Sequence, residues 1–355
     1  MTIDPTRVDA VLAKWPRASL AHLPTPLEPL PRLSVNYPGH ELWIKRDDCT
    51  GLAMGGNKAR QLEFYFGDAL SQGCDTVLST GAVQSNYMRT IAASAAKLGM
   101  TCHIQLESRV SNDSVDYRES GNVFLDQLFG AHIHHYDQGE DEFGADREIN
   151  RIADELRQAG HKPYVVPLAP VDQPKGALGY VAAAAELLVQ WTASGSMPDL
   201  LAVASGSGLT HAGLLIGLRI AGSDLPVLGA CVRRDAEQQQ NRILEHCRKL
   251  EPMLDCGVIV SGEDVMVDDR ALAPGYGMAS DGVMSTIAEM ARKEGILLDP
   301  VYSAKAIATT LQCLSTGDLD AYKRITLMHT GGTPALFAYR EDILASKPFQ
   351  AARTD

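Results

Sequence analysis

Short apolar runs alternate with stretches of helical periodicity along most of the chain. The apolar runs predict strands at Leu42–Lys45, Thr76–Ser79, His103–Leu106, Tyr164–Pro167, Leu200–Ala204, Val227–Val232 and Thr326–Met328. The same pattern predicts a helix at Asn86–Leu98, mostly loop at Glu107–Ser120, and a further helix that begins just beyond Gly121. Most strands are short and largely apolar, as a buried parallel sheet requires. This alternation predicts an α/β fold.

The length of 355 residues suits two domains, at roughly 150 residues each. The polar stretch Gln190–Pro198 and the region near Gly51–Arg60 are candidate junctions. We therefore predict two domains, each an open, mostly parallel sheet flanked by helices. Residues 61–180 form the small domain, and residues 1–60 together with 181–355 form the large one.

Composition excludes several classes of function. The formal net charge is -12, which repels nucleic acid and anionic lipid, so neither is an expected partner. A small anionic substrate would therefore need a local positive site. The N-terminus lacks an unbroken apolar segment, and no stretch reaches 18 apolar residues, so we expect a cytoplasmic protein without a membrane span.

Cysteine and histidine usage argues against a metal or disulfide framework. The seven cysteines are odd in number and form no C-x-x-C pair, which favours free thiols. Three histidines gather at 132, 134 and 135, but no carboxylate stands at ligand spacing from them. We predict no catalytic metal.

Four loops follow predicted strands or glycine turns, where open parallel sheets bind ligands. They are Gly51–Lys58, Thr80–Tyr87, Ser205–Thr210 and Thr330–Thr333. In the first, Asn57 is a candidate cap for a helix that carries Lys58 in its first turn. The positive end of that helix would lower the pKa of Lys58, which suits an amine that forms a Schiff base. A solvated lysine after a glycine turn is the alternative, and this fragment alone favours it.

The next two loops predict anion sites. Ser85, Asn86 and the backbone amides at their helix start can bind a carboxylate or a phenolate oxygen, although N-cap pairs are common without ligands. The run ASGSGLTHAG, residues 204–213, can cradle a single phosphate but does not match G-x-x-x-x-G-K-[ST]. It also lacks the G-x-G-x-x-G pattern of a dinucleotide-binding dehydrogenase. A glycine turn without a ligand remains an equal alternative for it.

The motifs GGNK, QSN, SGS-x-x-T-H-A-G, APGYG and LLDPVY-x-x-K follow one another in this order. Together with LPTPLEPL at 23–30 and the TGGTPALF corner, they resemble the fold type II, tryptophan-synthase-β-like pyridoxal-phosphate enzymes. More narrowly, the chain resembles the D-cysteine desulfhydrase and aminocyclopropane-carboxylate deaminase family. The resemblance implies that pyridoxal 5'-phosphate binds to the large domain, that the small domain closes over an amino-acid substrate, and that two chains form a homodimer.

The resemblance also assigns roles to individual residues. Lys58 would bind the cofactor covalently and later take the substrate proton, and Asn86 would bond the phenolic oxygen of the cofactor. Ser85, with Gln84, Asn86 and Tyr87, would hold the substrate. The remaining assignments are the phosphate cradle of Gly206, Ser207, Gly208, Leu209 and Thr210, the substrate-facing Tyr276 and Tyr302, and Ser303 or Thr330 at the pyridine nitrogen.

The implied activity is α,β-elimination from cysteine or another β-substituted alanine to pyruvate, ammonia and sulfide. Ring-opening deaminases of the family carry Glu where this chain has Ser303, which disfavours that activity. Two departures leave the substrate open: Tyr87 replaces the usual His after QSN, and LAPVDQPKGALGY at 168–180 replaces a glycine-rich loop. Gln173 and Lys175 could contact a leaving group there, so L-cysteate sulfo-lyase, which releases sulfite, is the alternative. The enantiomer and the oligomeric state stay undetermined.

Overall fold

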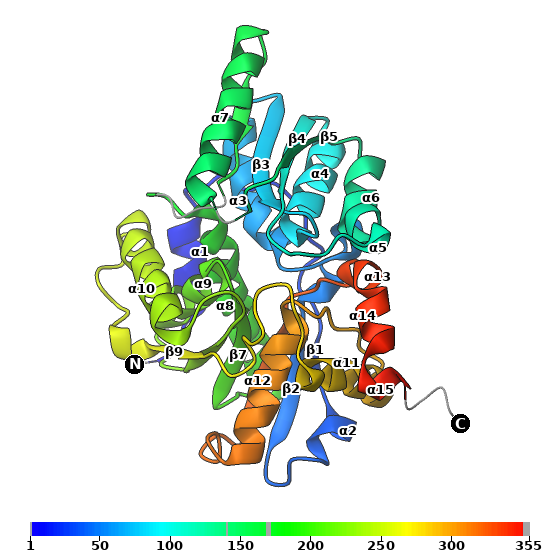
Figure 1. Cartoon of the computed structure of the whole chain (residues 1–355). Coiled ribbons are helices and arrows are strands. Elements are labelled where there is room, and N and C mark those ends of the chain that lie inside the picture. Colours follow the sequence, from blue (N-terminus) through cyan, green and yellow to red (C-terminus); the bar gives the residue numbers. More distant parts are fainter. Residues whose placement is uncertain (1, 140, 168–171, 351–355) are drawn as a thin grey trace.

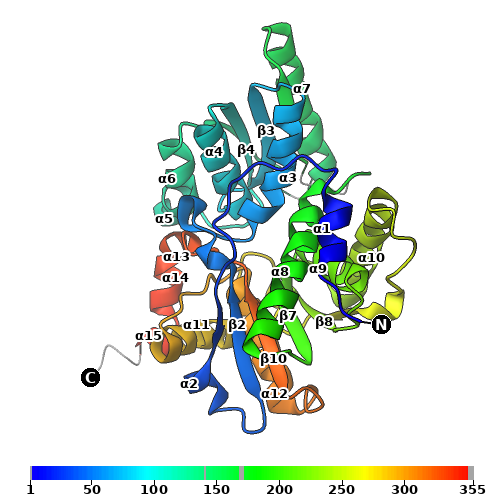
Figure 2. The ribbon, with the colours of Figure 1, turned by 180° about the vertical axis from the view of Figure 1, so that it is seen from behind.

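The computed structural model describes residues 2–139, 141–167 and 172–350, and contains two sheets with helices on both faces of each (Figure 1). In both views the four-stranded sheet with α4, α6 and α7 lies above the six-stranded sheet (Figures 1 and 2). The fold is therefore the predicted α/β architecture with two mostly parallel sheets.

The larger sheet has the order β1-β2-β10-β7-β8-β9 and is parallel except at the β1–β2 pair. Its strands are β1 (Leu27–Pro29), β2 (Glu41–Arg46), β7 (Leu200–Ser205), β8 (Val227–Cys231), β9 (Val265–Asp268) and β10 (Arg324–His329). The N-terminal β2 pairs along its whole length with the C-terminal β10. Neighbouring residues of β7 point to opposite faces, so Leu201 and Leu200 belong to different hydrophobic clusters. This explains why the strands read as continuous apolar runs.

Two sets of helices cover these two faces. Helices α1 (Thr6–Leu12), α8 (Leu178–Ser194), α9 (Leu209–Ile220) and α10 (Ala236–Met253) pack on one face. The other face packs against α2 (Pro31–Ser34), α11 (Asp281–Glu294), α12 (Ser303–Thr316), α13 (Ala335–Ala338) and α14 (Arg340–Ala345). Helix α15 (Lys347–Gln350) follows beside α11.

The smaller sheet has the order β5-β4-β3-β6 and is parallel throughout. It consists of β3 (Thr76–Ala82), β4 (Thr101–Glu107), β5 (His132–Tyr136) and β6 (Pro163–Val165). Its helices are α3 (Lys58–Ser71), α4 (Asn86–Leu98), α5 (Val115–Glu119), α6 (Gly121–Leu128) and α7 (Glu142–Gln158). Short 3-10 turns complete the chain at Asp47–Cys49, Leu52–Met54, Lys175–Ala177 and Gly262–Asp264.

The local predictions were mostly accurate, with two differences. Helix α4 has the predicted bounds. The segment expected to be mostly loop after β4 contains the short helix α5, which begins after Ser114 caps it. The stretch Gln190–Pro198 contains the last turn of α8, which continues to Ser194 and ends at Gly195 in the left-handed conformation. The proposed domain limits at residues 60 and 180 remain a prediction.

All seven cysteines are unpaired. Among the described residues, no helix is both long enough and apolar enough to cross a bilayer.

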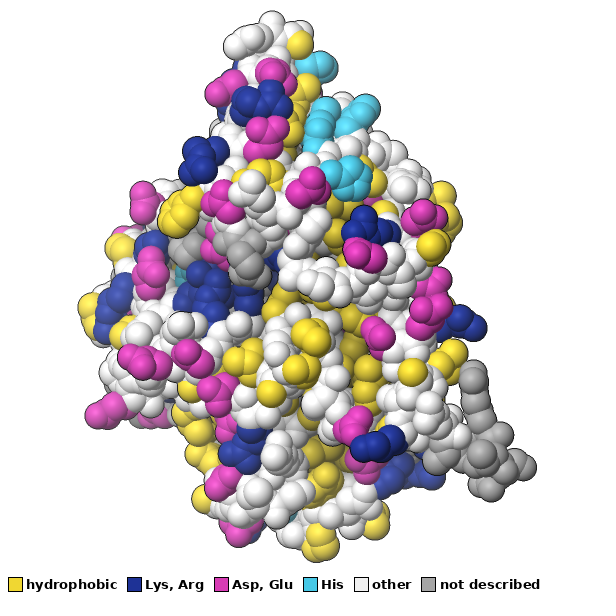
Figure 3. All heavy atoms as spheres, in the orientation of Figure 1, with side chains coloured by type: hydrophobic (Ala, Val, Ile, Leu, Met, Phe, Trp, Pro, Cys, Tyr) yellow, Lys and Arg dark blue, Asp and Glu magenta, His cyan; other side chains and the backbone are white. Residues whose placement is uncertain are grey.

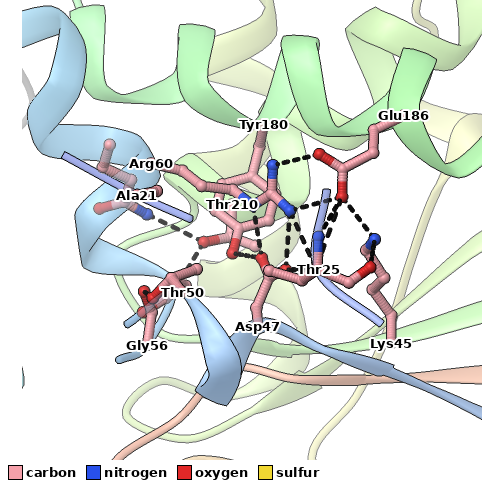
Figure 4. A network of polar contacts seen from close by, with 12 residues as sticks. Ala21, Thr25, Lys45, Asp47, Thr50, Gly56, Arg60, Tyr180, Glu186 and Thr210 are labelled. Carbon is pink, nitrogen blue, oxygen red and sulfur yellow. Dashed lines mark hydrogen bonds and ion pairs between the residues drawn. The ribbon is translucent and has the colours of Figure 1, made fainter. Parts of the chain in front are cut away.

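A buried ion-pair network connects the end of β2 and the turn that follows it with α3 and α8 (Figure 4). The fully buried guanidinium of Arg60, on α3, bonds both oxygens of Asp47 at 2.9 Å each and both oxygens of Glu186, on α8, at 2.9 and 2.8 Å. Lys45 lies 2.5 Å from the same Glu186, and the Tyr180 hydroxyl donates to Asp47 at 2.6 Å. Since Arg60 follows Lys58 by two residues, this network fixes the first turn of α3.

We expect Arg60→Met to lower the free energy of unfolding by about 3–5 kcal/mol, because Asp47 would stay buried without its partner. Urea unfolding of the purified protein measures this loss. Arg151→Met is the control, because Arg151 is an exposed arginine paired with Glu148 and Glu155 on α7, and such pairs contribute about 0–1 kcal/mol. Equal losses in the two variants would contradict a structural role of the network.

The network also predicts a dependence of stability on acid. Burial alone would raise the pKa of Asp47, but Arg60 and Lys45 outweigh burial and hold it below its usual value, and the same two cations lower the pKa of Glu186. A depressed pKa in the folded state contributes stability above the unfolded pKa of about 4, which is lost as pH falls through the folded pKa. The unfolding free energy of Arg60→Met should therefore change less between pH 6 and 3 than that of the wild type.

Candidate active site

A cavity with about 1150 Å³ of empty space, part of it open to solvent, lies between the two sheets. The residues that follow or end β3, β4, β7 and β10 line it, so the carboxyl ends of strands from both sheets meet there. Its lining brings together most of the predicted site residues: Lys58, Ser85, Asn86, Tyr87, Gly206, Ser207, Gly208, Leu209, Thr210, Tyr276, Tyr302 and Thr330.

Lys58 is the first residue of α3, and its amine lies in the cavity wall. Nζ is 3.4 Å from the side-chain oxygen of Gln61 and 5.5 Å from the centre of the Tyr87 ring. Burial lowers the pKa of Lys58 to about 8. The sequence had suggested the helix dipole as the cause, and burial in the folded protein lowers the pKa in the same direction. Near neutral pH the neutral, nucleophilic form of this amine is therefore much more populated than that of an ordinary lysine.

The predicted cap of α3 does not form. Asn57 has helical backbone angles, and its side chain donates to Thr210 Oγ1 at 3.1 Å instead of capping the helix. Gln61 donates to the same oxygen at 2.9 Å. Thr210 thus ties the first turn of α3 to the first turn of α9, so the Lys58 segment and the glycine-rich loop hold each other in place.

The start of α4 forms a compact polar surface in the cavity. Ser85 caps the helix, and its Oγ accepts from the amides of Tyr87 at 3.2 Å and Met88 at 3.3 Å. With its acceptor positions occupied, the Ser85 hydroxyl can donate to a carboxylate. The ring of Tyr87 lies beside Lys58, while its hydroxyl is buried and has no hydrogen-bond partner among the residues that the structure describes. Burial raises the Tyr87 pKa well above its usual value, so this hydroxyl stays protonated.

The loop between β7 and α9 fits a phosphate group. Gly208 adopts φ +90° at the N-cap of α9, where no side chain caps the helix, so its first amides are available to an anion. The positive φ and the distance of 3.0 Å from a Cβ at Gly208 to the His246 ring both favour glycine there. His246 Nε2 and Arg242 Nε contact the Ser207 carbonyl at 2.9 and 3.0 Å and fix the loop from outside.

Two tyrosines and a threonine complete the wall. The Tyr276 and Tyr302 hydroxyls are 2.6 Å apart, so one donates to the other and one hydroxyl proton remains for a ligand. Burial, followed by the nearby Tyr276, raises the pKa of Tyr302 well above its usual value. Thr330 follows β10, and its carbonyl accepts from the Asn57 amide at 2.9 Å.

Three residues that were predicted to contact the cofactor or the substrate do not line the cavity. Ser303 is fully buried and exchanges hydrogen bonds with Asp299, to whose Oδ1 its hydroxyl donates at 2.6 Å, so Thr330 is the hydroxyl that reaches the cavity. Gln84 points to the backbone of Tyr117, at 2.6 Å, and of Ser120. Lys175 pairs with Asp68 at 2.5 Å and does not line the cavity. The start of the 168–180 loop, residues 168–171, lies outside the described residues.

Sequence reasoning missed an arginine cluster at the cavity mouth, formed by Arg109, Arg233, Arg234 and Arg242. Arg233 and Arg234 lie 2.7 and 3.4 Å from one oxygen of Glu142, and Arg109 pairs with Glu107 at 2.6 Å. Figure 3 shows Lys and Arg side chains gathered on this face beside α10. The sequence could have predicted part of this cluster, because Arg109 and Arg233 follow the carboxyl ends of β4 and β8 within two residues.

The histidines on the small sheet are the nearest candidates for metal ligands. His103 and His134 lie 3.1 Å apart on neighbouring strands, and His132 stacks on His103. Within residues 2–139, 141–167 and 172–350, no group of three His, Cys, Asp or Glu side chains is arranged to hold a metal ion.

Comparison with known proteins identifies the family. Residues 18–331 match the model of the pyridoxal-phosphate dependent enzymes, so the chain belongs to this family. More particularly, it is 40% identical to D-cysteine desulfhydrase of Salmonella paratyphi A over 94% of this chain and 98% of the relative, and 39% identical to that of Salmonella typhi with the same coverage. The resemblance drawn from the motifs is confirmed.

Solved structures agree with this assignment. A structure described as an ACC deaminase homologue superimposes with a TM-score of 0.86 at 36% identity, covering 96% of this chain and 98% of that one. Diaminopropionate ammonia lyase of Escherichia coli, at 16% identity and a TM-score of 0.67 over 97% of this chain and 91% of that one, shares the fold. The cofactor of the family is pyridoxal phosphate, and the cavity fits it: an uncapped helix start with glycines for the phosphate and a lysine of low pKa for the aldehyde.

The pKa of Lys58 can be tested in the cofactor-free protein. With an amine-reactive reagent, we expect half-maximal labelling of Lys58 near pH 8, because only the neutral amine reacts. Lys347 serves as an internal control, since it is 84% exposed and its pair with Asp281 raises its pKa above that of an ordinary lysine, about 10.4. Mass spectrometry of peptides measures both sites, and identical pH profiles would contradict the burial effect.

Proposed function

We propose that the protein is a lyase that converts D-cysteine and water into pyruvate, ammonia and hydrogen sulfide. The observation that carries this proposal is the partly buried amine of Lys58, with its pKa of about 8, in the same cavity as the polar start of α4. Relatives named D-cysteine desulfhydrase, at 40% identity over nearly the whole chain, support this choice of substrate.

Different side chains around the cavity bind the substrate and take its α-proton. When bound, pyridoxal phosphate attracts the electrons released as the α C–H bond breaks. The Ser85 hydroxyl and the Asn86 amide at the start of α4 bind the substrate carboxylate and orient the Cα–H bond, while the amides of Tyr87 and Met88 hold the Ser85 oxygen in place. The Lys58 amine takes the α-proton, because its lowered pKa makes it an effective base near neutral pH.

The tyrosine pair serves the leaving group. Since the Tyr276 and Tyr302 hydroxyls share one hydrogen bond, a single proton points away from the pair and can pass to the departing sulfur. Burial raises the pKa of Tyr302, which keeps its hydroxyl protonated before the sulfur departs. Thr330 supplies a neutral hydroxyl to the cofactor ring, which suits rapid β-elimination. Cytoplasmic location and a homodimeric assembly are further parts of the proposal.

D-Cysteine turnover provides the direct test. We expect purified holoprotein to release equal amounts of sulfide and pyruvate from D-cysteine, and Lys58→Ala to lose both turnover and the absorption band of covalently bound cofactor. Lys175→Ala is the matched control, because Lys175 pairs with Asp68 outside the cavity and should leave the band and the rate unchanged. An unaltered band in Lys58→Ala would refute the assignment of Lys58, and absence of pyruvate would refute the substrate.

The arginine cluster favours L-cysteate as a second candidate substrate. Burial, followed by repulsion from neighbouring arginines, lowers the Arg234 pKa to about 10. One carboxylate, Glu142, faces Arg233, Arg234 and Arg242. In a chain of net charge -12, this cluster is the local positive site that an anionic substituent such as sulfonate requires. We propose sulfite release from L-cysteate as the alternative reaction.

Replacing Arg234 by Gln separates the two candidates. If a sulfonate binds the cluster, we expect KM for L-cysteate to rise about tenfold, the order of one charge-assisted hydrogen bond, with little change for D-cysteine. Steady-state kinetics with sulfite and sulfide detection provide the measurement. Equal effects on both substrates would instead assign the arginine to the cofactor phosphate.

A further inference from the structure

One fully buried arginine contacts both sides of the cofactor site without lining the cavity. Arg89, on the second turn of α4, donates through Nη1 to the side-chain oxygens of Asn86 at 2.8 Å and Asn122 at 2.7 Å. Through Nη2 it donates to the Gly55 carbonyl at 2.7 Å. Gly55 lies three residues before Lys58, so one guanidinium joins the segment before the lysine to the start of α4.

The chemistry of this contact determines the orientation of the Asn86 amide. A guanidinium has only donors, so the atom of Asn86 that it contacts must be the oxygen Oδ1. With Oδ1 engaged, the polar group of Asn86 left for a cavity ligand is the donor Nδ2–H2. A donor facing the cavity matches the phenolic oxygen of pyridoxal phosphate, whereas a flipped amide would present an acceptor to it.

Few other contacts could hold Arg89 or replace it. Asn122 is bound in turn by Gln84, whose Oε1 accepts from the Asn122 amide at 2.9 Å, so Gln84 supports the same network rather than the substrate. Asp126 and Asp299 attract the Arg89 cation, but in the described part of the chain neither oxygen of Asp126 has a hydrogen-bond partner, and burial raises the pKa of this carboxyl well above its usual range. The hydrogen bonds that orient Arg89 are therefore those to Asn86, Asn122 and Gly55.

We propose that Arg89 is a positioning residue that fixes Asn86 as a hydrogen-bond donor to the cofactor's phenolic oxygen. The proposal depends on the cofactor of the family and is independent of which amino acid is the substrate. It can therefore be tested by cofactor binding and absorption, without turnover.

The test compares Arg89→Met, Arg89→Lys, Asn86→Ala and the double variant Arg89→Met/Asn86→Ala. We expect Arg89→Met to weaken pyridoxal phosphate binding about tenfold or more, the order of one charge-assisted hydrogen bond, and to shift the pH midpoint of the cofactor band in the same direction as Asn86→Ala. In the double variant the midpoint should not shift beyond that of Asn86→Ala, because Arg89 acts through Asn86. Arg89→Lys should fall between wild type and Arg89→Met, since an ammonium lacks the planar fork.

Arg219→Met is the matched control, because Arg219 is also a mostly buried arginine and bonds Asp264 at 2.8 Å in the large sheet region, outside the cavity lining. It should lower the melting temperature and leave the cofactor band unchanged. The proposal is overturned if Arg89→Met behaves in the same way, or if its midpoint shift adds to that of Asn86→Ala. Should Arg89→Met fail to fold, Arg89→Lys and its double variant with Asn86→Ala decide by the same two criteria.

Discussion

The bidentate pairing of Arg60 with Asp47 and Glu186 is the interaction on which the site depends. Each of these side chains comes from a different element. A buried charge is tolerated only when oppositely charged partners hold it in a fixed geometry. The first turn of α3 cannot rotate without breaking these bonds. Lys58 therefore projects from a helix end that is held rigidly, although it lies between two sheets.

The cavity is built from contacts between segments that lie far apart in the chain. Thr210 receives hydrogen bonds from Asn57 and Gln61, and Arg89 binds the carbonyl of Gly55. Around Lys58, hydrogen bonds from polar side chains thus connect separate loops. The apolar faces of the sheets supply the bulk of the stability. This separation lets the mouth of the cavity carry charged arginines without disturbing the core.

The sequence was informative where the local pattern decides the structure. Helix α4 kept its predicted bounds because Ser85 caps it and Gly99 ends it in the left-handed conformation. Motif order placed Lys58, Asn86 and the glycine loop in one site. Two exceptions depend on tertiary partners, because Gln84 turns to backbone carbonyls and Lys175 turns to Asp68. No spacing along the chain encodes these two choices, since each partner comes close only in the folded protein. Ser303 turns instead to Asp299, four residues earlier, in a local contact that the motif-based assignment did not consider.

The pairing of β2 with β10 sets an order for assembly on the ribosome. β2 ends at Arg46, while its parallel neighbour β10 ends at His329, so the centre of the large sheet joins the two ends of the chain. At a synthesis rate of roughly 5–20 residues per second, β2 waits on the order of tens of seconds for that neighbour. The four-stranded sheet, made entirely of residues between them, has all its strands long before. Because Thr330 follows β10 and lines the cavity, the cofactor site is complete only when nearly the whole chain has been synthesised, so full cofactor capture belongs to the last moments of synthesis or later.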